Sequence, residues 1–180
     1  MTTQILLAGF GGQGLLFAGK FLAYAGLIEG KQVSWLPSYG PEMRGGTANC
    51  SVILSDEPIG SPIVLAPDIL VAMNLPSFMK FAPAVQPGGL LLADSAMFAA
   101  QTDRTDVRAF YLPATQMAYE NGMQGLANIL LVGKLLHEAN ILAPKTARAA
   151  MEKTIPPRKA ALLEKNLQAL QYGMRWQAEA

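Results

Sequence analysis

The sequence predicts a doubly wound α/β fold: a mostly parallel, Rossmann-like sheet with helices on both faces and a helical C-terminal third. Three observations predict it. Short apolar runs alternate with helical stretches, the first run ends in a glycine-rich turn, and only helical patterns follow residue 112 of the 180. Because no internal repeat, low-complexity tract or linker interrupts this order, we expect residues 1–180 to form a single domain.

The first part of the chain contains three predicted strands around one long helix. Residues 4–8 are a short apolar run closed by glycine, as in a buried parallel strand. Residues 15–29 form a helical stretch, and Gly30 after it suits the left-handed position at a helix end. A second strand covers residues 32–36 and is closed by a proline, and a third covers residues 47–54.

The rest of the chain predicts three further strands and a helical end. Strand patterns cover residues 69–73, 90–93 and 107–112, and helical patterns cover 77–84, 115–121, 124–140 and 145–154. The last helix is predicted to start near Pro156 and Pro157, residues that suit a first helical turn. Apolar residues then recur at spacings of three and four, which predicts one buried stripe: Leu163, Leu167, Leu170 and Met174.

Composition limits the classes of function. The formal net charge is +1 and no basic block occurs, so nucleic-acid binding has no electrostatic support. No stretch reaches the roughly 20 apolar residues of a membrane helix, and the first residues lack the basic region of a secretory signal, so we expect a cytoplasmic protein. Charged residues make up 15% and mean hydropathy is +0.25, which favours burial of part of the surface by a partner over a packed core alone.

The counts of cysteine and histidine limit the cofactors. The chain has one cysteine, Cys50, and one histidine, His137. These are too few for an internal disulfide, an iron–sulfur cluster or a structural zinc site held by this chain alone, so we expect no metal ligands and no tightly bound cofactor. Cys50 alternates with apolar neighbours and is interpreted as a packed thiol, and His137 lies in an apolar helix and is interpreted as structural.

The turn after the first strand has the pattern G-x-G-x-x-G, formed by Gly9, Gly11 and Gly14. Glycines at this spacing allow a tight turn, close packing of strand on helix, and backbone amides that receive phosphate. A nicotinamide site also needs an acidic residue at the end of the second strand. Residues 34–38 contain none, and Glu29 comes too early. The pattern therefore leaves open a purely structural crossover, a phosphate-bearing ligand, or contact with a partner backbone.

Other residues at the same predicted edge of the sheet are further candidates. Gly12 makes the turn thinner, and Gln13 opens the helix with a side chain that both donates and accepts hydrogen bonds. Asn74, directly after the strand at residues 69–73, is either a backbone cap or a site residue. Asp94 also follows a strand, and we interpret it as a cap of the next segment.

A second glycine-rich loop follows the second strand. It places one acid and one base between glycines, with an aromatic residue at its start, in the sequence Tyr39-Gly40-Pro41-Glu42-Met43-Arg44-Gly45-Gly46-Thr47. Since open α/β folds bind ligands at the carboxyl edge of the sheet, Glu42 and Arg44 are predicted to make an ionic or phosphate-facing contact there. The alternative is a mutual surface ion pair, worth less than about 1 kcal/mol.

Together these motifs resemble the gamma subunit of the 2-oxoacid:ferredoxin (acceptor) oxidoreductases. The stretches GFGGQG, SWLPSYGPEMRGGTANCSVILSD, SPIV and PDILVAMN occur in that family's order from Gly9 to Asn74, and Pro87-Gly88-Gly89 and the helix containing Asn128 also fit. The chain looks most similar to the separate, small gamma chains of the multi-subunit enzymes for 2-oxoglutarate and branched-chain 2-oxoacids. The resemblance implies that residues 1–180 are a single gamma domain.

The resemblance implies a component of an enzyme, inactive when isolated. Such enzymes decarboxylate a 2-oxoacid (2-oxoglutarate, by overall likeness), reduce ferredoxin and form acyl-coenzyme A. In the family, thiamine diphosphate with Mg²⁺ lies in alpha and beta subunits and iron–sulfur clusters in beta and delta polypeptides. The implied partners are therefore alpha, beta and delta chains, with ferredoxin as acceptor. This chain itself lacks the G-D-G and downstream Asn-Asn signature of thiamine enzymes.

Gamma domains of this family lie near the coenzyme A side of the active site, so the resemblance implies binding residues and no catalytic ones. The cofactor-binding candidates are Gly9, Gly11, Gly12, Gln13, Gly14, Tyr39, Glu42, Arg44, Gly45, Gly46, Thr47 and Asn74. Two alternatives stay open: a free-standing nucleotide-binding module of the Rossmann or flavodoxin type, and a structural scaffold that binds no small molecule. The low charge is also compatible with a homodimer of the isolated chain.

Overall fold

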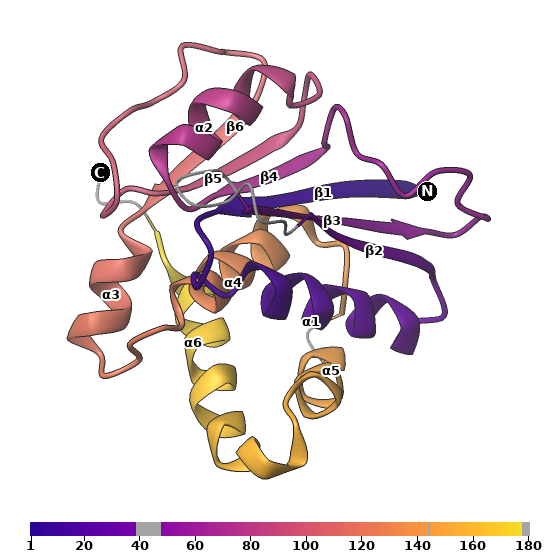
Figure 1. Ribbon diagram of the computed structural model, residues 1–180, viewed down its shortest axis with the longest axis vertical. Helices are drawn as coiled ribbons and strands as arrows, with labels where there is room; N and C mark the ends of the chain where they lie inside the picture. The colour runs from indigo at the N-terminus through magenta and orange to yellow at the C-terminus, as the bar shows by residue number, and fades with distance from the viewer. Residues whose placement is uncertain (39–47, 144, 178–180) are drawn as a thin grey trace.

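The alternation of strands and helices produces the predicted α/β arrangement. In the computed structural model, which describes residues 1–38, 48–143 and 145–177, a six-stranded sheet has the order β2-β3-β1-β4-β5-β6 (Figure 1). Its strands are β1 (Thr2–Gly9), β2 (Gln32–Ser38), β3 (Ala48–Ser55), β4 (Ile69–Ala72), β5 (Leu90–Asp94) and β6 (Arg108–Leu112).

The strands of this sheet share one direction except for β3. β1, β4, β5 and β6 are parallel neighbours, whereas β3 lies between β1 and β2 and is antiparallel to both. The prediction of a mostly parallel sheet is confirmed, with β3 as its reversed strand. Because of this reversal, β2 ends and β3 begins at the edge where β1 ends: Gly9 pairs with Ala48, and Ser38 pairs with Asn49.

Helices cover both faces of the sheet, as predicted. They are α1 (Leu15–Ile28), α2 (Leu75–Phe81), α3 (Ala114–Glu120), α4 (Ala127–Ala139), α5 (Thr146–Thr154) and α6 (Leu163–Arg175), with two 3₁₀ turns, η2 (Ala82–Ala84) and η3 (Pro157–Leu162). α1 and α3 to α6 lie on one face, and α2 with η2 lies on the other (Figure 1). In β1, Ile5 and Leu7 face the first layer and Leu6 and Ala8 the second, which explains the uninterrupted apolar run.

Helix α1 approaches the sheet closely because two of its residues have no side chain. A Cβ atom on Gly19 would lie 2.5 Å from the Sγ of Cys50, and one on Gly26 would lie 2.6 Å from a methyl carbon of Leu54. The helix therefore packs directly on β3 with its glycine face. Although α1 is largely apolar, no helix within the described residues is both long and apolar enough to cross a bilayer.

Helices α4 and α6 cross with their backbones in contact. A Cβ atom on Gly133 would overlap the carbonyl oxygen of Leu170, and one on Gly173 would overlap the carbonyl oxygen of Leu130. Small residues at a crossing allow two helix axes to come closer than side chains permit. This contact, with the predicted stripe residues Leu167 and Leu170 buried beside it, fixes the helical C-terminal third on α4.

A buried lysine holds the segment that follows α6. The Nζ atom of Lys134 forms an ion pair with Glu138 at 2.7 Å and donates to the carbonyl oxygen of Trp176 at 3.1 Å. The same ammonium lies 4.6 Å from the ring centre of Phe110 in β6 and 5.4 Å from that of Trp176. Charge, hydrogen bond and aromatic rings together compensate its removal from water and hold the end of α6 near β6.

Two predicted boundaries that relied on prolines were wrong. Pro37 does not close the second strand, because β2 continues through it to Ser38. β2 is the outermost strand, where a residue without an N–H group is tolerated. The last α-helix does not start at Pro157: residues 157–162 form a 3₁₀ turn with non-helical angles at Lys159, and α6 begins at Leu163.

Candidate functional site

The candidate site lies at the edge of the sheet where β1, β2, β4 and β5 end. Gly9, Ser38 and Asp94 close three of these strands, and Asn74 follows the fourth. Six of the predicted binding residues fall in the loop between β2 and β3 and lie outside the described residues: Tyr39, Glu42, Arg44, Gly45, Gly46 and Thr47. The roles given to them stay predictions. Of the two residues that flank this loop, Ala48 pairs with Gly9, and Ser38 lies one strand further out, where it pairs with Asn49.

The first glycine loop needs glycine at three of its positions for different reasons. Gly12 and Gly14 have positive φ angles of 91° and 76°, which other residues rarely adopt. At Gly9 the reason is space, since a Cβ atom there would lie 2.5 Å from the Oε1 atom of Gln13. Gly11 and Gly12 are exposed at the surface. The loop is therefore thin and presents backbone to its surroundings.

Helix α1 starts from this loop without a side-chain cap. Gly14 is its N-cap residue, and no acidic residue occupies the first turn. Since the first hydrogen bond of the helix runs from Ala18 to the carbonyl oxygen of Gly14, the amides of Leu15, Leu16 and Phe17 have no intrahelical acceptor. Uncapped amides and the positive end of the helix dipole are suited to an anionic group.

Gln13 joins the glycine loop to the end of β4. Its Oε1 atom accepts a hydrogen bond from the backbone N–H of Phe10 at 2.6 Å, and its Nε2 atom donates to the carbonyl oxygen of Met73 at 3.0 Å. The side chain therefore uses both its donor and its acceptor, as the sequence suggested. Because Asn74 directly follows Met73, this contact places two predicted site residues, Gln13 and Asn74, close together.

Asn74 is a helix cap with unused hydrogen-bonding capacity. Its Oδ1 atom accepts from the N–H of Ser77 at 2.8 Å, which confirms capping as one of its two proposed roles. Its Nδ2 atom and the hydroxyl of Ser77 are buried, and neither has a hydrogen-bond partner among the described residues. Buried polar atoms are seldom left unpaired, so these donors indicate a polar group that completes the edge.

Asn128 is a residue of this edge that sequence reasoning did not place in the site. It lies at the start of α4, is 3% exposed, and its Nδ2 atom donates to the carbonyl oxygen of Gly14 at 2.9 Å. Its Oδ1 atom is buried without a partner among the described residues. An asparagine within an otherwise apolar helical run was the available signal, but its partner is 114 positions away.

Two other polar residues, Asp94 and Glu29, have structural roles. Asp94 accepts hydrogen bonds from the N–H of Ala96 and from both the N–H and the hydroxyl of Thr115, which confirms its interpretation as a cap. Glu29, which came too early to hold a ribose, instead accepts from the N–H of Ala143 at 2.6 Å and the hydroxyl of Thr146 at 2.7 Å, in the segment where α5 starts.

The remaining thiol and imidazole do not contribute to the edge. Burial raises the pKa of the Cys50 thiol to about 12, against a smaller opposing effect of its hydrogen bond with Trp35. The thiol is therefore protonated at neutral pH and unsuited to nucleophilic attack. His137 is exposed near the end of α4. Within residues 1–38, 48–143 and 145–177, no three His, Cys, Asp or Glu side chains are grouped so as to hold a metal ion.

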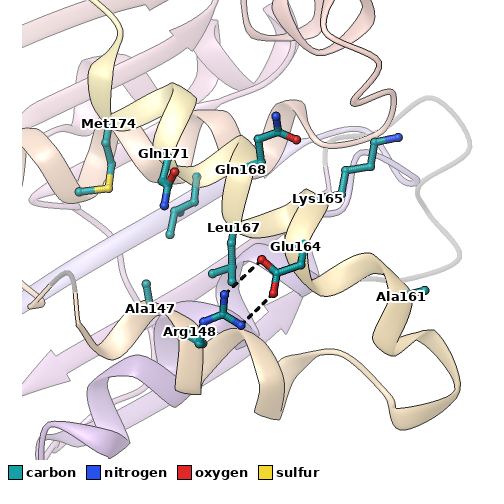
Figure 2. A pocket seen from close by; sticks show the side chains of 10 residues that line it. Ala147, Arg148, Ala161, Glu164, Lys165, Leu167, Gln168, Gln171 and Met174 are labelled. Carbon is teal, nitrogen blue, oxygen red and sulfur yellow. Dashed lines mark hydrogen bonds and ion pairs between the residues drawn. The ribbon is translucent and has the colours of Figure 1, made fainter.

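A separate groove of about 680 Å³ lies between α5 and α6 (Figure 2). The guanidinium group of Arg148 crosses it and binds both carboxylate oxygens of Glu164, at 2.9 and 3.1 Å. Arg148 and Glu164 therefore neutralise each other. Lys165 and Gln168, both exposed, are also among the residues that line the groove. No residue from the carboxyl edge of the sheet lines this groove, so we place the candidate site at the edge.

Comparison with known proteins assigns the family. The sequence model of the protein family described as pyruvate ferredoxin/flavodoxin oxidoreductase matches residues 4–176. The chain belongs to this family. This assignment agrees with the resemblance found in the sequence motifs, and it extends that resemblance through α6.

Relatives of this family occur as separate subunits and as parts of longer chains. The chain is 36% identical to the 2-oxoglutarate synthase subunit KorC of Methanocaldococcus jannaschii, with coverage of 96% of this chain and 92% of that relative. It is 40% identical to the ketoisovalerate oxidoreductase subunit VorA of Methanothermobacter thermautotrophicus over 98% of its own length, but spans only 36% of that relative. The solved gamma subunit of a keto/oxoacid ferredoxin oxidoreductase from Geobacter sulfurreducens superposes with a TM-score of 0.82 at 29% identity, covering 96% of both chains.

Proposed function

We propose that this chain is the gamma component of a multi-subunit 2-oxoacid:ferredoxin oxidoreductase, with residues 1–180 as one gamma domain. The observation that carries the proposal is the family match over residues 4–176, together with near full-length similarity to a 2-oxoglutarate synthase subunit. In this reaction a 2-oxoacid and coenzyme A give acyl-coenzyme A and CO₂, and two electrons pass to ferredoxin. Thiamine diphosphate with Mg²⁺ and iron–sulfur clusters, held by alpha, beta and delta companions in the cytoplasm, supply the decarboxylation and electron-transfer chemistry.

The role proposed for this chain is binding at the coenzyme A side of the shared active site. The uncapped amides of α1 and the thin glycine loop suit the negatively charged phosphates of coenzyme A. The unpaired donors of Asn74 and Ser77 lie at the same edge. Arg44, in the loop between β2 and β3, is proposed to add a positive charge. The chain orients one substrate, and the companions carry out the bond cleavage.

The proposed substrate is 2-oxoglutarate. The KorC relative matches this chain over nearly its whole length, whereas the VorA relative, which is slightly more identical, has most of its length outside the match. Because of the similarity to the VorA relative, branched-chain 2-oxoacids are the second candidate. Residues that select the 2-oxoacid are expected on the subunits that hold thiamine diphosphate.

The experiment is reconstitution with companion subunits. The chain is co-expressed with a thiamine-binding pair and a ferredoxin-like subunit of the same class of enzyme, and viologen reduction is measured with 2-oxoglutarate, 2-oxoisovalerate or pyruvate. We expect reduction that depends on both a 2-oxoacid and coenzyme A, fastest with 2-oxoglutarate, and none with the isolated chain. An isolated chain that retains flavin or nicotinamide, or oxidises a substrate by itself, would instead identify a free-standing nucleotide-binding module.

The role of Arg44 has its own test in the reconstituted complex. Arg44→Ala is expected to raise the KM for coenzyme A about tenfold, the effect of losing one charge-assisted contact of roughly 1.4 kcal/mol. Arg158→Ala, which removes an exposed arginine of η3, is the matched control and should leave this KM unchanged. Equal KM values and equal recovery of the complex for the two variants would remove Arg44 from the site.

A further inference from the structure

The glycine loop is fixed in place by two side chains, one from the loop itself and one from α4. A loop with four glycines, two of them at positive φ angles, has many accessible conformations, so a single functional conformation needs additional contacts. Gln13 attaches the loop to the end of β4, and Asn128 attaches its last residue to α4. The two attachments come from opposite sides of the loop, since β4 continues the sheet and α4 belongs to the helical layer below it (Figure 1).

We infer that Gln13 and Asn128 are positioning residues, which hold the backbone of residues 10–17 so that its free amides are in the arrangement that binds coenzyme A. The inference rests on the proposed function. Neither side chain needs to touch the ligand itself. Each acts through backbone that it holds, and small displacements of a binding group are enough to weaken a substrate contact.

Gln13 closes the loop on itself and on the sheet at the same time. Its backbone N–H donates to the carbonyl oxygen of Phe10 at 3.3 Å, while its Oε1 atom accepts from the N–H of Phe10 at 2.6 Å. Its Nε2 atom donates to the carbonyl oxygen of Met73, the residue before Asn74. The end of β4 and the turn after β1 are therefore one connected unit, and no apolar side chain of the same size could connect them.

Asn128 fixes the start of α1. Its amide nitrogen would lie 2.5 Å from a Cβ atom on Gly14, so it occupies the space of the side chain that Gly14 lacks. From there it donates to the carbonyl oxygen of Gly14, the same oxygen that accepts the first helical hydrogen bond from Ala18. The direction in which the uncapped amides of α1 point is thereby set by α4.

A further observation at this edge concerns buried polar atoms without hydrogen-bond partners. Three polar atoms there are buried and unpaired within the described part of the chain: the Nδ2 atom of Asn74, the hydroxyl of Ser77 and the Oδ1 atom of Asn128. Asn128 holds the loop directly, and Asn74 follows Met73, whose carbonyl oxygen accepts the hydrogen bond from Gln13. Ser77 is in turn the residue that Asn74 caps. A purely structural support would be expected to satisfy its own polar atoms.

The test uses the reconstituted complex and the variant Gln13→Glu. The substitution keeps length and the acceptor for Phe10, but directs a carboxylate oxygen at the carbonyl oxygen of Met73 where a donor was. We expect the KM for coenzyme A to rise about tenfold, with kcat and the KM for the 2-oxoacid within about twofold of the parent values. Gln168→Glu introduces the same charge at an exposed position of α6. It should match the parent in kcat, in the KM for coenzyme A and in the KM for the 2-oxoacid.

A second variant and a second measurement cover the case of poor folding. Asn128→Ala removes the donor to Gly14 and should raise the same KM, and hydrogen exchange of residues 9–17 in the complex should be faster in both variants than in Gln168→Glu. If Asn128→Ala yields no complex, the inference is judged on Gln13→Glu alone.

The outcomes separate the two proposals. If the parent complex reduces viologen without any need for coenzyme A, the proposed function itself is wrong. If the parent needs coenzyme A but Gln13→Glu has the same KM as Gln168→Glu, the positioning role is overturned and the proposed function stands. A loss of stability in Gln13→Glu with an unchanged KM for coenzyme A also overturns the positioning role.

Discussion

Glycines have opposite tasks in two regions of this molecule. At the crossing of α4 and α6, Gly133 and Gly173 bring two backbones into direct contact, and a Cβ atom on either would overlap a carbonyl oxygen. At the carboxyl edge of the sheet, Gly12 has a positive φ angle and nothing within 4 Å of the position of a Cβ atom. At the helix crossing, glycine allows two backbones to pack closely. At the sheet edge, glycine allows a backbone conformation that other residues rarely adopt.

Because of this difference, substitutions in the two regions are expected to affect different properties, stability at the helix crossing and binding at the sheet edge. At the helix crossing, any added atom must displace a backbone, so the cost falls on the folded state. At Gly12, an added methyl group meets no neighbour and the cost comes from the backbone angle, which also sets where the amides point. We therefore expect the first region to control unfolding and the second to control binding.

The largest effect is expected at the helix crossing. Gly173→Ala should lower the free energy of unfolding by about 3 kcal/mol, because the helices must separate to admit a methyl group between backbones. Urea denaturation of the purified chain measures it. Gly60→Ala, at an exposed position with free space around it, is the matched control and should change stability by less than about 0.5 kcal/mol. Similar values for both variants would contradict the close backbone contact.

A smaller effect on stability, with an effect on binding, is expected in the loop. Gly12→Ala and Gly30→Ala both place an alanine at a positive φ angle in free space, so each should cost about 1 kcal/mol of stability. Gly30 follows α1 at the opposite end from the glycine loop. In the reconstituted complex, Gly12→Ala should raise the KM for coenzyme A and Gly30→Ala should not. An equal change in both would mean that the loop acts only through general stability.

The smallest effect near neutral pH is expected at Cys50, which is buried where β3 packs against α1. The thiol has a pKa of about 12 in the folded chain instead of 9.0, so at pH 8 it should not react with a disulfide reagent until the chain unfolds. Between pH 9 and 12 the unfolded chain loses this proton first and binds fewer protons than the folded one. Stability should therefore fall as pH rises through that range. Rapid labelling of the folded chain at pH 8 would contradict the burial.

Local chemistry made most of the fold predictable. Alternating apolar runs and helical stretches fixed the fold class, Gly30 was correctly placed after α1, and Asp94 was correctly interpreted as a cap. Each of these depends on neighbours close in the chain. The same is true of the glycine loop, whose requirement for a positive φ angle follows from the turn between β1 and α1.

Features that depend on distant pairing were not predictable in the same way. The reversal of β3 depends on its insertion between β2 and β1, which no pattern within β3 encodes. Pro37 looked like a strand end, because nothing in its neighbourhood showed that β2 would be an outer strand. Asn128 binds Gly14 from 114 residues away. For the loop at residues 39–47, the sequence remains the basis of every role assigned.

The contacts of Lys134 have a consequence for observing this protein in solution. They keep the indole of Trp176 beside β6, at one border of the sheet, while the chain's other tryptophan, Trp35, belongs to β2 at the opposite border. The two indoles also differ in surroundings, one next to an ammonium group and the other next to a thiol. In a variant in which one of the two is replaced by phenylalanine, the fluorescence of the other therefore reports on its own border of the sheet, without any label being attached.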